Sequence, residues 1–133
     1  MIESAEHFKK LRLSEDLEEQ RLSTLDSADI EVWYEVINKY PELREWVVAN
    51  KTIQIEILEH LATDSDSKVR YAVARKRKIN DSIFNLLKSD PDETVRHSLL
   101  YNTKLPLEKK RQIKVDDSDW LTHELNLKIK NIG

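Results

Sequence analysis

A chain of 133 residues and 15.7 kDa is large enough to bury a core without stabilising cross-links. The absence of cysteine excludes disulfides and thiolate metal sites. No apolar run approaches the ~18 residues of a membrane span, and the N-terminus has no apolar signal-peptide core, which favours a cytoplasmic, non-membrane protein. The net charge of −3 hides an asymmetry, because residues 1–67 carry 16 acidic and 7 basic side chains and residues 68–133 carry 9 acidic and 15 basic ones.

Two short helices are predicted before any repeated pattern begins. Residues 4–12 form the first, with Ser4 as its cap and three apolar residues on one face: Ala5, Phe8 and Leu11. The second is expected from Ser14 or Glu15, and its apolar contacts are Leu17, Leu22 and Leu25. Neither segment matches the repeat that follows, so residues 1–26 are predicted to cap the N-terminal end of a stack.

The dominant feature is a repeat with a period of 26 residues. The segment from Asp64 to Ile79 recurs from Asp90 to Leu105. The matched positions are Asp64/Asp90, Asp66/Asp92, Val69/Val95, Arg70/Arg96, Val73/Leu99, Lys78/Lys104, Ile79/Leu105 and, upstream, Leu61/Leu87. A fixed period of this length indicates stacked supersecondary units rather than a closed globule.

Each unit is expected to be a helix, a short acidic turn and a second helix. Three pairs occupy residues 27–106, the first beginning at a Ser27 cap, and residues 107–133 form a degenerate C-terminal capping repeat. The turn at Asp90 reads as a capping box, with Asp90 as cap and Pro91 at the first helical position. The residues predicted to be deeply buried are Trp46, Val69, Val73, Leu87, Val95 and Leu99, and Trp33 and Trp120 by spacing.

The pattern Asp-x-Asp-x-x-Val-Arg-x-x-Val/Leu resembles two related helical-repeat families, the HEAT repeat and the bacterial leucine-rich repeat variant (LRV-like). The 26-residue period lies nearer the second. The resemblance implies an all-α fold, a right-handed α-solenoid of three to four antiparallel helix pairs, and a role as a binding scaffold. The first unit departs from the pattern because Asn38-Lys39-Tyr40-Pro41 replaces the acidic joint, and Trp46 replaces the small Ala72 and Ser98. Without cysteine, the chain lacks the iron–sulfur ligands that some leucine-rich repeat variant proteins carry.

One arginine recurs in every unit, at positions 44, 70 and 96. Helical spacing puts this residue at the flank of its helix, where it meets the neighbouring unit. Arg44, Arg70 and Arg96 are therefore expected to form a ladder between units, each bonded to an acidic turn residue such as Asp66 or Asp92. Ligand binding is the alternative role for this column.

The helix face opposite the core is the predicted binding surface, on what would be the concave side of the stack. Besides Ala74 and Leu100, it carries aromatic, histidine and cationic side chains of kinds that favour interfaces. The residues expected to contact a partner are Tyr71, Arg75, Lys78, His97, Tyr101, Lys104 and His123. An ordinary solvated helix face is the alternative interpretation.

The sequence favours a monomeric, non-catalytic bacterial protein that binds another protein, as an adaptor or an immunity-type protein. No metal or cofactor is expected, because His97 and His123 fall one unit apart, roughly 10 Å, too far for one zinc ion. The alternative function is weak nucleic-acid binding by the basic C-terminal half. The cationic run from Arg75 to Lys78 motivates that alternative.

Overall fold

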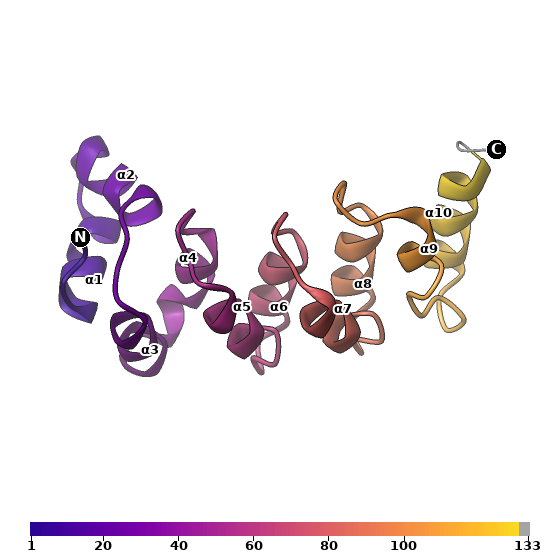
Figure 1. Ribbon diagram of the computed structural model, residues 1–133, viewed down its shortest axis with the longest axis horizontal. Coiled ribbons are helices and arrows are strands. Elements are labelled where there is room, and N and C mark those ends of the chain that lie inside the picture. The colour runs from indigo at the N-terminus through magenta and orange to yellow at the C-terminus, as the bar shows by residue number, and fades with distance from the viewer. Residues whose placement is uncertain (131–133) are drawn as a thin grey trace. The chain divides into compact units, whose positions relative to one another are not determined.

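The computed structural model describes residues 1–130, which form ten α-helices, one 3-10 helix and no β-strand, apart from an isolated bridge between Ile2 and Ala28 (Figure 1). The helices are α1 (Ala5–Leu13), α2 (Leu17–Leu25), α3 (Ile30–Lys39), η1 (Pro41–Leu43), α4 (Arg44–Ala49), α5 (Ile55–Leu61), α6 (Ser67–Ala74), α7 (Asp81–Leu87), α8 (Glu93–Leu100), α9 (Leu107–Lys110) and α10 (Asp119–Lys130). The all-α prediction is confirmed. None of these helices combines the length and the apolar character that crossing a membrane requires. The chain divides into two compact units, Met1–Leu61 and the part that follows from Ala62.

The first unit is built on the contact of α1 with α2 and α3. Ser4 caps α1 by accepting a hydrogen bond from the His7 N–H, as predicted. Phe8 of α1 and Trp33 of α3 are fully buried and meet edge to face, with ring centroids 5.2 Å apart. Pro41 occupies the first position of η1, where its missing N–H has no helical partner to lose.

The second helix and the start of the third differ from the prediction. α2 begins at Leu17 with Asp16 as its cap, and its three leucines are exposed while Ser23 is buried. The small Ser23 lets α2 approach α1 closely, and its hydroxyl accepts a hydrogen bond from Arg12. Ser27 does not cap α3, because this helix begins at Ile30 and its cap position is occupied by Asp29. The Ser27 carbonyl accepts the Ile2 N–H beside the bridge between the two segments.

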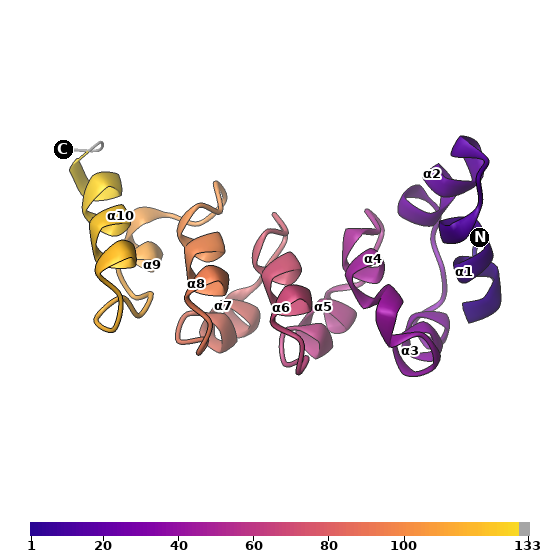
Figure 2. The ribbon, with the colours of Figure 1, turned by 180° about the vertical axis from the view of Figure 1, so that it is seen from behind.

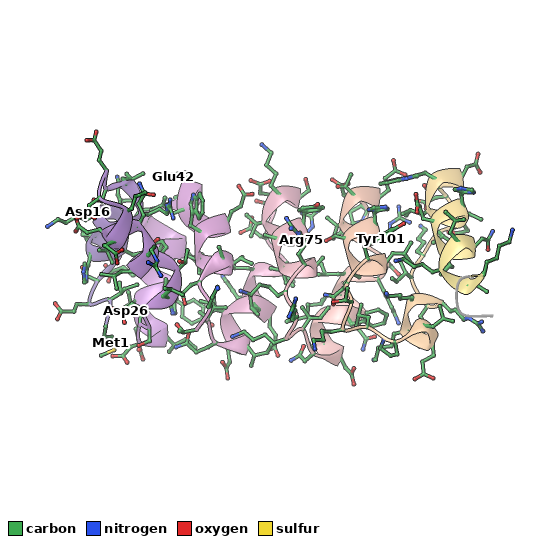
Figure 3. All side chains as sticks on the ribbon, turned by 90° about the horizontal axis from the view of Figure 1, so that it is seen from above. Met1, Asp16, Asp26, Glu42, Arg75 and Tyr101 are labelled. Atoms are coloured by element: carbon green, nitrogen blue, oxygen red, sulfur yellow. The ribbon has the colours of Figure 1, made fainter. Side chains whose placement is uncertain are left out.

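The N-terminus lies against the end of α2. The α-amino group of Met1 forms an ion pair with Asp26 at 3.0 Å (Figure 3). A hydrogen bond from this ammonium holds the pKa of Asp26 below its ordinary value. The start of the chain is thus fixed beside the turn that leads into α3.

The prediction that Trp46 is buried is wrong, because 42% of this residue is exposed. The core side of η1 and α4 is formed instead by the aliphatic residues Leu43, Val47 and Val48. The Trp46 ring lies at the boundary of the core, where the Arg12 guanidinium covers it at 3.8 Å from the ring centroid. A large aromatic ring at a boundary position remains half in solvent.

In the second unit, α6, α8 and α10 lie side by side in one row, and α7 and α9 lie in another (Figure 1, Figure 2). The predicted burial of five residues is confirmed: Val69, Val73, Leu87, Val95 and Leu99. Ala74 and Leu100 are also fully buried, contrary to the prediction that they belong to the exposed face. A helix in such a row contacts neighbours beside it as well as across the layers, so more than one face is buried. Trp120, in the first turn of α10, is 42% exposed and is another error of the spacing argument.

Paired aspartates start α6 and α8 in the same way. Asp66 accepts the Lys68 N–H and Asp92 accepts the Thr94 N–H, while the aspartate two residues earlier accepts the N–H of the capping aspartate. The predicted capping box at Asp90 is therefore wrong, since Asp92 is the cap and Pro91 lies outside the helix. Asp90 cannot serve as the cap because its carboxylate is bonded to the Asp92 N–H and to an arginine.

The predicted arginine ladder is confirmed for two of its members, with different carboxylate partners. Arg70 donates to both oxygens of Asp90, at 2.8 and 3.2 Å. Arg96 donates to both oxygens of Asp117, at 2.6 and 3.0 Å, and to the Lys114 carbonyl at 2.7 Å. The arginines bind the first or second acid of the next turn, whereas Asp66 and Asp92 are used as helix caps. Each bidentate pair fixes a helix to the turn that precedes the corresponding helix of the next repeat.

The Arg96 pair predicts a specific pH dependence of stability. Hydrogen bonds from Arg96 hold the pKa of Asp117 below its ordinary value, so the folded chain binds this proton less readily than the unfolded chain. The stabilisation is present above the unfolded pKa of about 3.9 and is lost as the pH falls through the lower folded pKa. We expect Asp117→Asn to flatten the fall in unfolding free energy between about pH 5 and about pH 2. Urea unfolding followed by circular dichroism at several pH values measures this, with Asp116→Asn as the control variant. An equal slope of unfolding free energy against pH in the wild type and both variants would contradict the prediction.

Two asparagines bind carbonyl groups at the end of a helix that lies about one repeat earlier in the sequence. Asn102 donates to the carbonyls of Ala74 and Lys76 at the end of α6, both at 2.9 Å, and accepts the Lys104 N–H. In the first unit Asn50 donates to the carbonyls of Ser23 and Asp26 at the end of α2. Both asparagines are buried. Residues 1–130 contain no positive φ angle, so these helix ends are satisfied without the left-handed residue that commonly closes a helix.

Candidate functional site

The second unit contains a pocket of about 230 Å³ at the C-terminal ends of α6 and α8. Its walls come from these two helices and from the turns that follow them: Tyr71, Arg75, Arg77, His97, Ser98, Tyr101, Asn102 and Thr103. Four of the seven residues predicted to contact a partner therefore lie together here, namely Tyr71, Arg75, His97 and Tyr101. Arg75 and Tyr101, the residues that directly follow α6 and α8, are labelled in Figure 3.

The other three predicted residues do not line the pocket. Lys78 and Lys104 lie beyond the ends of α6 and α8, in turns where helical spacing no longer fixes the direction of a side chain. His123 is exposed on α10, while His97 of α8 lines the pocket. Of the predicted binding surface, only the residues within α6 and α8 and the first residue after each helix therefore lie together at the pocket.

Aromatic rings continue from the pocket onto α10. The His97 ring contacts Tyr101, at 4.6 Å between ring centroids, and stacks on Trp120 at 4.2 Å with an interplanar angle of 15°. The Tyr101 hydroxyl donates to Glu124, and this hydrogen bond raises the pKa of Tyr101. Lys128 covers the Tyr101 ring at 3.8 Å from its centroid. Side chains of α10 therefore hold His97 and Tyr101 in place from one side.

Sequence reasoning missed Trp120 and Glu124 as members of this site. Trp120 was expected in the core, and Glu124 falls on the inward face when the 26-residue register is extended to α10. A polar residue at an inward position was the one signal that could have identified Glu124. We call the set Tyr71, His97, Tyr101 and Trp120 the aromatic face.

The charged side chains of the pocket are all cationic. Arg75 lies 5.7 Å from the centroid of the Tyr71 ring, measured from its guanidinium carbon, and Arg77 lines the same pocket. None of the described residues that line the pocket is an aspartate or a glutamate. Within residues 1–130, neither arginine forms an ion pair with a carboxylate, in contrast to Arg70 and Arg96. The described side chains of the pocket wall therefore include positive charges and no carboxylate that balances them.

One polar atom in the pocket wall lacks a hydrogen-bond partner. Ser98 is only 7% exposed, and its hydroxyl oxygen is buried without a partner among the residues that the structure describes. Most buried polar groups in folded proteins are hydrogen-bonded, so such an atom requires an explanation. The sequence placed Ser98 on the inward face, at the register of Ala72, but gave no reason for its hydroxyl.

The described part of the chain brings no three His, Asp or Glu side chains together in a way that would hold a metal ion. Comparisons with protein-family models, with curated proteins and with solved structures found no match.

Proposed function

We propose that the chain is a helical-repeat protein with a 26-residue unit, arranged as a right-handed α-solenoid of three to four helix pairs. The spacing of the helices supports the period, because α5 and α7 begin at Ile55 and Asp81, and α6, α8 and α10 begin at Ser67, Glu93 and Asp119. The recurring contacts of the buried asparagines and of the ladder arginines support the stack, because both join a helix to a neighbouring unit.

We propose further that the protein acts without catalysis and binds a protein partner through the aromatic face and the adjoining pocket. The observation that carries this proposal is the concentration of large, half-exposed rings around a cationic pocket: Tyr71, Tyr101 and Trp120 are 38%, 44% and 42% exposed. Tyrosine, tryptophan and arginine dominate the binding energy of protein interfaces, because they offer a large contact area with few torsions to restrict. The stack on His97 and the contacts from α10 restrict two of these side chains before any partner binds.

A comparison of matched variants tests this function. We expect the tagged wild-type chain to capture a partner from a bacterial lysate, and Tyr71→Ala with Tyr101→Ala to lose it, with a fall in affinity of about tenfold or more once the partner is purified. Mass spectrometry identifies the partner, and titration calorimetry measures the affinity. The identified partner also distinguishes an adaptor from an immunity-type protein.

Leu86→Ala is the control, since Leu86 is a large exposed apolar residue of α7 that does not line the pocket. Circular dichroism first establishes that all variants are folded. A partner that binds the tyrosine variants as tightly as the wild type would place the interface on another surface. Capture of nucleic acid alone, sensitive to salt, would favour the alternative function of the basic C-terminal half.

A further inference from the structure

We infer that the pocket between the ends of α6 and α8 receives a carboxylate from an acidic segment of the partner protein. This inference rests on the proposed function and names the chemistry that the site recognises. It assigns Arg75, Arg77 and Ser98 to the carboxylate, and the aromatic face to the residues beside it in the partner segment.

The charge of the pocket selects an anion. Arg70 and Arg96 each hold a carboxylate of their own chain in two hydrogen bonds, which is the usual arrangement of a fixed structural arginine. Arg75 and Arg77 have no such pair within residues 1–130, and they lie in one pocket with no acidic residue in its wall. A carboxylate from outside the chain would complete the same bidentate pattern here.

The unpartnered hydroxyl of Ser98 points to the same ligand. A serine buried to this degree loses its bonds to water on folding and regains none from the described part of the chain. Alanine occupies the matching position of α6, so the fold does not require a hydroxyl at this register. A carboxylate oxygen that reaches the Ser98 hydroxyl would accept its proton, and would thereby satisfy this buried atom.

The size and position of the pocket favour a carboxylate over a phosphate. A volume of about 230 Å³ is below the roughly 300–1,000 Å³ of small-molecule and cofactor sites, and suits a side chain or a chain terminus rather than a nucleotide. The pocket lies at the C-terminal ends of two helices, where the helix dipole is negative and part of the arginine charge is offset. Sites for dianionic phosphate groups use the N-terminal ends instead.

The inference is tested by selecting ligands from an unbiased library. Ten-residue peptides displayed on phage are selected against the full-length wild-type chain and against Arg75→Gln with Arg77→Gln. We expect the wild type to enrich peptides with Asp or Glu at one fixed position, or with a free terminal carboxylate, beside an aromatic or aliphatic residue. The double variant should not enrich them. Enrichment without an acidic group, or no enrichment at all, would overturn the inference.

Fluorescence anisotropy with the selected peptide then tests each contact. Replacing its Asp or Glu by the amide should weaken binding about tenfold or more if the side chain is recognised, and C-terminal amidation should do so if the terminus is. Ser98→Ala should weaken binding about fivefold while leaving the free protein as stable as the wild type or more stable. A merely structural hydroxyl would give the opposite pattern, so weaker stability with unchanged affinity would remove Ser98 from the site.

Arg111→Gln is the matched control for the arginine variants, because Arg111 is exposed beyond α9 and does not line the pocket. Inorganic phosphate and adenosine monophosphate are used as competitors, and displacement of the peptide by either at a concentration below that of acetate would overturn the carboxylate assignment. The two proposals fail separately. A lysate partner that is lost with the tyrosine variants but retained by Arg75→Gln with Arg77→Gln would preserve the protein-binding function and refute the carboxylate.

Discussion

Replacing Val73 by Asp is expected to destabilise the second unit strongly. Val73 lies on the core side of α6 and is fully buried, so the new carboxylate would lose its water without gaining a partner. The lost apolar contact adds to this cost, and the sum is about 4 kcal/mol or more of unfolding free energy. A domain of ordinary stability has only about 5–15 kcal/mol to lose. Thermal and urea unfolding followed by far-ultraviolet circular dichroism measures the effect.

Lys68→Asp provides the control, because it introduces the same carboxylate into the same helix at an exposed position. Lys68 is in the first turn of α6, where a negative charge suits the helix dipole, so the change in stability should stay within about 0.5 kcal/mol. Equal losses in the two variants would mean that charge, rather than burial, determines the result, and would contradict the position of Val73 in the core.

Replacing Asn102 by Ala is expected to cost about 2–3 kcal/mol, the second largest effect. The change removes two hydrogen bonds to carbonyls at the end of α6 and one from the Lys104 N–H, and it leaves these groups without their partner in a buried place. Amide hydrogen exchange should show faster opening at the end of α6 than at its start. Urea unfolding gives the total loss.

Asn126→Ala is the matched substitution on an exposed face of α10, and alanine is the better helix former there, so the stability should be unchanged or slightly higher. A loss in Asn102→Ala no larger than in this control would show that water replaces the amide without cost. The helix end would then not depend on the next unit.

The fold was predictable where one face of a helix decides burial. The spacing of Val69, Val73, Val95 and Leu99 identified the core side of α6 and α8, since a buried aliphatic residue at each turn leaves little choice of orientation. The prediction of burial failed at Trp46 and Trp120, because helical spacing gives the direction in which a side chain points and not how deeply it is buried. Both residues are 42% exposed, so each ring is covered on part of its surface and reaches into solvent with the rest.

The cap positions were misjudged for a related reason. The turns contain two aspartates two residues apart, and either could begin the helix when only propensity is considered. The choice is made by a residue distant in sequence, since Arg70 binds Asp90 and leaves Asp92 to cap α8. Contacts between units of this kind are not visible in the local pattern.

Helical spacing also predicted four of the eight residues that line the pocket. Tyr71 and His97 are helical residues on the face predicted to lie opposite the core, and both line the pocket. The unpaired state of Arg75 and Arg77 and of the Ser98 hydroxyl was not predictable, because it depends on which partners the folded chain fails to provide. Lys78 and Lys104 were misplaced because they follow the ends of their helices, where the helical period no longer applies.

The asparagine that closes α6 also sets an order of events during synthesis. Asn102 follows Ala74 by 28 residues, so the ribosome completes α6 long before the side chain that will bind its last carbonyls has been made. The nascent α6 therefore emerges with carbonyl groups at its end that cannot bind Asn102 until that residue has been made. Each newly made unit would finish the one before it, and the chain would gain its order from the N-terminal side in steps that follow translation.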